Sequence, residues 1–202
     1  MNILIPYNTH YLRAQYNLDG AILNQLNTDV IPSLVNRLCV DERIVKLDVM
    51  TNIDISGKLS PSSKVEILDL DTAKLETRVQ VIDSYLQNTK LGDEEFLIVY
   101  NPLFPFISIS KLQGAHQAVV NGASQTAVGS FINGSFETRS AAEQYLDIGA
   151  FSVHKISTVK SVGHHLSYPL DIFRLSASES VCLRDAQDLE LYGLIKNSGF
   201  LS

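Results

Sequence analysis

The chain has 202 residues, of which 45% are hydrophobic and 19% are charged, and its formal net charge is −6. This length and apolar content suit one folded domain, and the acidic balance argues against a nucleic-acid-binding surface. Cys39 and Cys182 are the only cysteines, which argues against a disulfide framework and favours a reducing cytoplasmic location. We expect no signal peptide and no membrane-spanning segment, because no apolar run has the required length.

The first third of the chain predicts a short apolar strand ended by Pro6, a polar loop, two short helices and two further strands. The second of these helices accommodates a proline because that residue lies in its first turn. The predicted ranges are 2–5 for the first strand, 7–17 for the loop, 20–26 and 29–38 for the helices, and 44–50 and 65–68 for the strands.

The most regular pattern in the chain follows and predicts a helix over residues 72–87. Asp71 is placed to cap its free backbone amides. Apolar residues then recur at steps of four, three and four, which gives one continuous stripe along the helix. These residues are Leu75, Val79, Ile82 and Leu86.

Residues 96–100 form an unbroken apolar run flanked by polar residues, which is typical of a central strand buried on both faces. Asn101 and Pro102 end this strand. Ser110 and Gln113 then match a capping box for a helix that reaches about residue 120.

The last third predicts three more strands, a tight turn, a short helix and a solvated loop, and then a short strand running into a final helix capped by Asp185. The ranges are 126–132, 150–153 and 172–175 for the strands, Asn133-Gly134 for the turn, 140–145 for the helix and 154–165 for the loop.

Strands that alternate with helices predict a three-layer α/β/α, Rossmann-like fold with a mostly parallel sheet. We expect a single domain over residues 1–202, with a short excursion at about 133–147. Such folds bind ligands beyond the carboxyl ends of their strands. The loops expected at that edge cover residues 7–17, 51–52 and 101–106.

Several short motifs in these loops carry a family resemblance. Ile5-Pro6 ends the first strand, Arg13 and Asn17 follow in the first loop, and Asn101-Pro102 follows the central strand. In this order they resemble the cytidylyltransferases that make CMP-sugars, such as the CMP-sialic acid and CMP-Kdo synthetases. The resemblance covers nearly the whole chain as a pattern of elements, and it implies a nucleotide-diphospho-sugar transferase fold.

The chain departs from this family where the family binds phosphate and metal. The glycine turn of the nucleotide loop is replaced by residues 7–10, and Tyr16 stands where the family has a phosphate-binding lysine. Cys182 and Arg184 occupy the two places at which the family's carboxylates hold magnesium. A thiol and a cation cannot replace the carboxylates that a hard cation requires.

The resemblance implies a site for a nucleotide and a sugar-like small molecule. It assigns no catalytic residue and no metal ligand, and Mg²⁺ would be needed only if the protein were active. The implied nucleotide- or ligand-binding residues are Tyr7, Asn8, Arg13, Asn17, Thr51 and Asn101.

Other patterns admit a functional and a structural interpretation. Asp69-Leu70-Asp71 is the triplet with which glycosyltransferases bind a metal, but Asp71 also serves as a helix cap. His164-His165 could be a metal pair or part of a loop, and Cys182 a nucleophile or an inert apolar residue. The first loop also contains three tyrosines, which either stack on a base or sugar ring or cover the edge of the sheet: Tyr7, Tyr11 and Tyr16.

Two functions are compatible with the sequence. The first is a divergent cytidylyltransferase-like enzyme that transfers a nucleotidyl group to a sugar or sugar acid. The second is a non-catalytic homologue that binds a ligand or a partner protein in polysaccharide biosynthesis. A homodimer is compatible with either function.

Overall fold

The computed structural model describes residues 1–69, 75, 77–130, 149–162, 167 and 169–198. The strands of these residues form one seven-stranded sheet in the order β3-β2-β1-β4-β6-β5-β7, in which β6 runs antiparallel to both of its neighbours. The strands are β1 (Asn2–Tyr7), β2 (Lys46–Thr51), β3 (Val65–Leu68), β4 (Phe96–Tyr100), β5 (Thr126–Ser130), β6 (Phe151–Lys155) and β7 (Leu170–Arg174).

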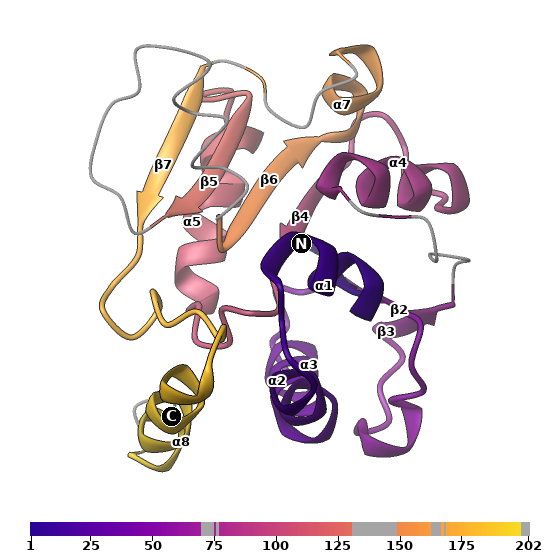
Figure 1. The fold of residues 1–202 in the computed structure, drawn as a ribbon. Coiled ribbons are helices and arrows are strands. Elements are labelled where there is room, and N and C mark those ends of the chain that lie inside the picture. Colours follow the sequence, from indigo (N-terminus) through magenta and orange to yellow (C-terminus); the bar gives the residue numbers. More distant parts are fainter. Residues whose placement is uncertain (70–74, 76, 131–148, 163–166, 168, 199–202) are drawn as a thin grey trace.

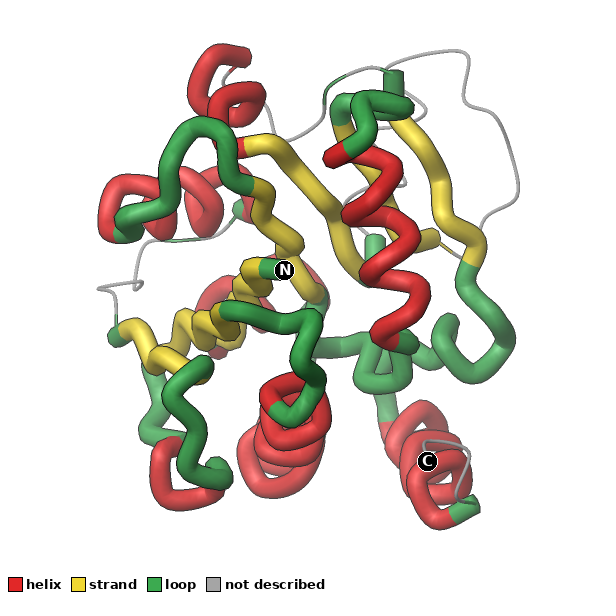
Figure 2. Tube along the Cα trace, turned by 180° about the vertical axis from the view of Figure 1, so that it is seen from behind, coloured by secondary structure: helices red, strands yellow, loops and turns green. Residues whose placement is uncertain are grey.

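Helices cover both faces of this sheet (Figures 1 and 2). The helices α4 and α7 lie on one side of the sheet, and α2 and α3 lie on the other. Figure 2 shows α5 in front of the strands when the molecule is seen from behind. The α-helices among the described residues are α1 (Thr9–Tyr16), α2 (Gly20–Gln25), α3 (Ile31–Cys39), α4 (Arg78–Asn88), α5 (Ile109–Val120), α7 (Ile156–Val162) and α8 (Ala186–Asn197); a π-helical turn, η1 (Leu26–Val30), joins α2 to α3, and a 3-10 turn, η2 (Ser56–Lys58), follows β2.

Side-chain contacts assign α4 and α5 to opposite faces of the sheet. Tyr85 of α4 donates its hydroxyl to Asp48 of β2 at 2.6 Å. In α5, the His116 ring packs edge to face with the ring of Phe96 of β4, with 5.7 Å between the ring centroids. Asp48 pairs with Leu4 of β1, and Leu4 pairs with Val99 of β4, so the side chains of Asp48 and Val99 lie on the same face of the sheet. Side chains alternate along a strand, and Phe96 is three residues before Val99, so Phe96 lies on the opposite face from Asp48. The predicted three-layer α/β/α fold with a mostly parallel sheet is therefore confirmed.

Pro6 does not end the first strand, contrary to the prediction. β1 continues to Tyr7 and pairs with β2 along its whole length, whereas its pairing with β4 covers only Asn2 to Leu4. Pro6 thus has no ladder partner on the β4 side, and a residue without an N–H is tolerated at such a position.

The predicted loop over residues 7–17 is also wrong, because most of it forms helix α1. Asn8 is extended, and its side-chain oxygen accepts the N–H groups of His10 and Tyr11 at 2.9 and 3.1 Å. At the other end, Asn17 adopts the left-handed conformation with φ 53° and donates its N–H to the Arg13 carbonyl. Asparagine suits both positions.

Two predicted helix starts are corrected. Helix α4 begins at Arg78 rather than at residue 72, because Thr77 and Gln80 form a complete capping box there; Asp71 lies outside the described residues. Helix α5 is capped by Ser108, which accepts the N–H of Lys111, and the predicted cap Ser110 lies within the helix.

Two predictions in the last third are wrong as well. Residues 154–162 are not a loop: His154 is buried in β6, and α7 follows. Residues 181–184 do not form a strand, although Leu183 donates its N–H to the Leu103 carbonyl. The cap of the last helix is confirmed, since Asp185 and Asp188 form a capping box.

Some predictions lie outside the described residues. They are the turn at 133–134, the helix at 140–145, the excursion at 133–147 and the His164-His165 pair. Within the described residues, no helix has the length and apolarity needed to cross a membrane.

Gly129 of β5 lies directly against an aromatic ring. It pairs with Phe151 of β6, and a Cβ atom built at residue 129 would be 2.2 Å from that ring. Non-bonded carbon atoms do not approach so closely, so the neighbouring strand has to move if residue 129 carries a side chain. Glycine is therefore required here by packing rather than by its backbone angles.

We expect Gly129→Ala to lower the free energy of unfolding by about 3 kcal/mol, because the ring cannot leave the core. Urea denaturation monitored by circular dichroism measures this loss. Gly114→Ala in α5 is the matched control: the added Cβ would lie 3.5 Å from Phe173, an ordinary contact, and should stabilise the helix by about 0.5 kcal/mol. Equal effects of the two substitutions would contradict the packing explanation.

Candidate functional site

The carboxyl ends of β1 and β2 lie side by side, and their loops are joined. Tyr7 pairs with Thr51 in the sheet. Beyond them, Asn52 donates its side-chain amide to the Thr9 hydroxyl at 2.9 Å and accepts the Thr9 N–H at 3.0 Å. This link holds the start of α1 over the end of β2.

Three of the predicted binding residues are buried and form hydrogen bonds with other residues of the protein. The Tyr7 ring is fully buried, and its hydroxyl donates to the Asn27 side chain. Asn8 is buried and caps α1. The buried Thr51 hydroxyl accepts the N–H of Ile53 at 3.0 Å, which forms the turn after β2. These side chains shape the loops at the carboxyl edge of the sheet.

Arg13 and Asn17 lie on the outside of the same edge. Both are exposed, Arg13 in the last turn of α1 and Asn17 directly after it. A cation at the carboxyl end of a helix is favoured by the helix dipole. Of the six predicted binding residues, Arg13 is the only one with a positive charge.

Asn101 directly follows β4 and is buried. Its side-chain amide donates to the Tyr16 hydroxyl at 3.0 Å and to the Gly149 carbonyl at 3.2 Å, and its side-chain oxygen accepts the Leu103 N–H at 3.1 Å. Asn101 therefore joins the end of β4 to α1 and to the segment before β6.

A small crevice separates the ends of β1 and β4. The Tyr11 and Tyr16 rings meet edge to face, with 6.4 Å between their centroids. The crevice holds about 10 Å³, close to the space of one water molecule. Its lining residues are Pro6, Tyr11, Tyr16, Val99, Asn101 and Pro102. Sequence reasoning identified the tyrosines of this region but not the contact between Tyr16 and Asn101, which are 85 residues apart.

The segment before α8 carries no acidic side chain at the two positions that the resemblance assigns to magnesium ligands. Burial raises the pKa of the Cys182 thiol to about 12, so the sulfur stays protonated at neutral pH. The structure thus supports the interpretation of Cys182 as an inert apolar residue. Arg184 is exposed. Among the described residues, no group of three or more His, Cys, Asp or Glu side chains is arranged to hold a metal ion.

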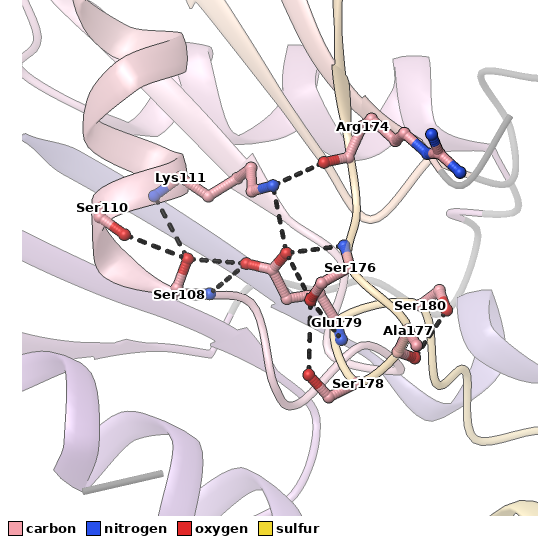
Figure 3. Close-up of polar contacts among 9 residues, drawn as sticks. All are labelled: Ser108, Ser110, Lys111, Arg174, Ser176, Ala177, Ser178, Glu179 and Ser180. Carbon is pink, nitrogen blue, oxygen red and sulfur yellow. Dashed lines mark hydrogen bonds and ion pairs between the residues drawn. The ribbon is translucent and has the colours of Figure 1, made fainter. Parts of the chain in front are cut away.

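Glu179 fixes this closing segment to the start of α5 (Figure 3). One carboxylate oxygen accepts the N–H and hydroxyl of Ser108 at 3.0 and 2.7 Å. The other accepts the N–H and hydroxyl of Ser176, both at 2.9 Å, and pairs with Lys111 at 3.2 Å. Lys111 also donates to the Arg174 carbonyl at 2.5 Å. A carboxylate in a serine-rich run was the only sequence signal for this cluster.

The Glu179 cluster holds its carboxylate in the charged form. Burial opposes ionisation, but the hydrogen bonds from Ser108 and Ser176 outweigh it and lower the pKa of Glu179 to about 2. The side chain is only 7% exposed and lies at the amino-terminal end of α5, where the helix dipole favours a negative charge. With all of these donors engaged, Glu179 is a structural anchor.

Comparisons with known proteins identify the fold. The chain matches no protein family and no curated protein sequence. It does resemble solved structures. CMP:2-keto-3-deoxy-manno-octonic acid synthetase complexed with CTP superimposes with a TM-score of 0.65 at 11% identity, over 98% of each chain.

Two further structures give the same result. The 4-diphosphocytidyl-2C-methyl-D-erythritol synthase of Anaerococcus prevotii has a TM-score of 0.61 at 10% identity and covers 97% of this chain and 95% of its own. The 2-C-methyl-D-erythritol 4-phosphate cytidylyltransferase of Francisella tularensis has a TM-score of 0.60 at 14% identity, over 96% of this chain and 99% of its own. The chain therefore has a cytidylyltransferase-like, nucleotide-diphospho-sugar transferase fold.

The Glu179 anchor predicts a specific acid sensitivity. The folded-state pKa of Glu179, about 2, lies below the ordinary value of 4.5. The contribution of Glu179 to the free energy of unfolding is therefore complete above about pH 4.5 and is lost as the pH falls towards 2. We expect Glu179→Gln to lower the free energy of unfolding by about 2 kcal/mol at neutral pH. Urea denaturation should show a shallower decline for this variant than for the native protein on acidification.

Asp93→Asn is the matched control, because Asp93 is largely exposed and its ion pair with Lys160 lies at the surface. A surface pair contributes little, so the control should behave as the native protein does. Parallel acid profiles of the native protein and Glu179→Gln would contradict the anchor.

Proposed function

We propose that this protein is a non-catalytic relative of the CMP-sugar cytidylyltransferases that binds a nucleotide or sugar-like small molecule between the ends of β1 and β4. The observation that carries the proposal is the chemistry of the closing segment. A buried, protonated thiol at Cys182 and a guanidinium at Arg184 stand where the resemblance requires two magnesium-binding carboxylates. Cys182 and Arg184 do not fit a magnesium site, so no catalytic step is assigned to that ion at these positions.

The charge of the site supports the same proposal. A triphosphate is usually held by backbone amides of a glycine-rich loop, by basic side chains and by a metal ion. Here Asn8 caps α1 with its own side chain, and Arg13 supplies the one positive charge among the predicted binding residues. Such a site is suited to a ligand of low negative charge, such as a nucleoside monophosphate or a neutral sugar, rather than to a nucleoside triphosphate with magnesium.

A second candidate function is divergent cytidylyl transfer to a sugar or sugar acid. It is favoured by the near-complete coverage of the match with the CTP-bound synthetase. An active enzyme would need Mg²⁺ and would require ligands other than Cys182 and Arg184. A role in polysaccharide biosynthesis, a cytoplasmic location and a homodimer remain predictions of the sequence.

Thermal-shift measurements with CTP and CMP, with and without Mg²⁺, separate the two functions. For a binding protein we expect stabilisation by CMP that is independent of Mg²⁺, because only binding to the folded state raises the melting temperature. Stabilisation by CTP that depends on Mg²⁺, together with release of pyrophosphate in the presence of a sugar acid, would support the enzyme. No shift with any nucleotide would contradict nucleotide binding.

A charge substitution at α1 tests the location of the site. We expect Arg13→Gln to weaken CMP binding about tenfold in calorimetric titrations, because one charge-assisted hydrogen bond to phosphate is lost. Arg43→Gln is the matched control, since Arg43 is also an exposed arginine but lies before β2, at the opposite edge of the sheet. An equal loss for both variants would indicate general electrostatic attraction rather than a site at α1.

A further inference from the structure

The place proposed for the ligand is already filled by a side chain of the protein. Tyr16 extends from α1 to the end of β4 and accepts a hydrogen bond from Asn101 at 3.0 Å. With Tyr16 in this position, the crevice holds about 10 Å³, which is far too small for a nucleotide or a sugar. Any ligand of that size must displace Tyr16 or bind elsewhere.

The hydrogen bonds of Asn101 show what a ligand would have to replace. One amide hydrogen is donated to Gly149 and the side-chain oxygen accepts from Leu103, so both of these contacts hold the backbone of the site. The remaining hydrogen is donated to Tyr16. Displacing Tyr16 leaves this buried donor without a partner unless the ligand brings an acceptor, because unpaired buried donors are unfavourable.

Displacement of Tyr16 does not require the rest of α1 to leave the core. It is the last residue of α1, it is only half-buried, and Asn17 breaks the helix directly after it. The buried residues of α1 are Tyr11 and Leu12, which fix the helix to the core and do not depend on Tyr16 remaining in the crevice. Tyr11 presents its ring to the same space.

We propose that Tyr16 is an internal occupant of the ligand site and competes with the ligand for Asn101. The proposal rests on the proposed function and adds the class of ligand and its control. The ligand has a planar ring with a hydrogen-bond acceptor, as a pyrimidine base does, because the crevice is shaped by a phenol that accepts from Asn101 and meets the Tyr11 ring. The apparent affinity equals the intrinsic affinity multiplied by the fraction of molecules in which Tyr16 has left the site.

The first test needs no ligand. In Tyr16→Phe the ring remains but the acceptor is lost, so we expect the side-chain amide resonances of Asn101 to move upfield and their hydrogens to exchange faster with solvent. Tyr85→Phe is the matched control, because it removes the same atom from a hydrogen bond to Asp48, and neither of these residues lines the crevice. Unchanged Asn101 resonances in Tyr16→Phe would overturn the contact.

The second test measures binding of CMP and cytidine by calorimetric titration. We expect Tyr16→Ala to bind both about tenfold or more tightly than the native protein, because the internal competitor is gone. Melting curves show whether Tyr16→Ala is folded. If it is not, Tyr16→Phe replaces it in the test, and we expect a smaller gain in affinity for that variant. Affinities equal to or weaker than the native value in folded variants would overturn internal competition.

The two proposals fail in different ways. Shifted Asn101 resonances with no binding of any nucleoside or nucleotide to either variant would overturn both nucleotide binding and competition, while leaving the hydrogen bond as a structural contact. Tight binding by the native protein with no gain in Tyr16→Ala would leave the binding function intact and overturn competition alone.

Discussion

The unequal pairing of β1 is the constraint on which the rest of the site depends. β1 follows β2 along its whole length but leaves β4 after Leu4, so the ends of β1 and β4 diverge. The space between the two diverging strand ends is lined by two tyrosines of α1, Tyr11 and Tyr16, which shield it from solvent. The capping of α1 by Asn8 and its link to Asn52 then fix where these tyrosines lie.

The sheet was predictable because its strands are apolar runs between turn residues, and the ranges of β3 and β4 were predicted without error. Helix starts were harder. Serine, threonine, asparagine and aspartate occur in clusters along this chain, so that several residues are equally suited to cap a helix, and packing selects among them. α1 was missed because it buries only Tyr11 and Leu12, which leaves too little apolar periodicity to detect.

The predicted binding residues lie at one edge of the sheet, as expected from the topology, but the directions of their side chains could not be read from the sequence. Parallel strands bring their carboxyl ends together whatever the side chains are, so the three loops could be located from topology alone. Whether Tyr7 points inward to Asn27, or Tyr16 reaches Asn101, is decided by contacts between residues far apart in the sequence. The loss of acidic residues in the closing segment, by contrast, was visible directly in the sequence, because it concerns residue types rather than geometry.

The burial of both cysteines has a practical consequence. Cys39 and Cys182 are the only thiols in the chain, and both are enclosed in the core. A cysteine introduced at the exposed Ala14 of α1 would be the one thiol open to a maleimide reagent in the folded protein. A fluorophore or spin label could thus be attached to this helix in the otherwise native chain, without first removing the natural cysteines.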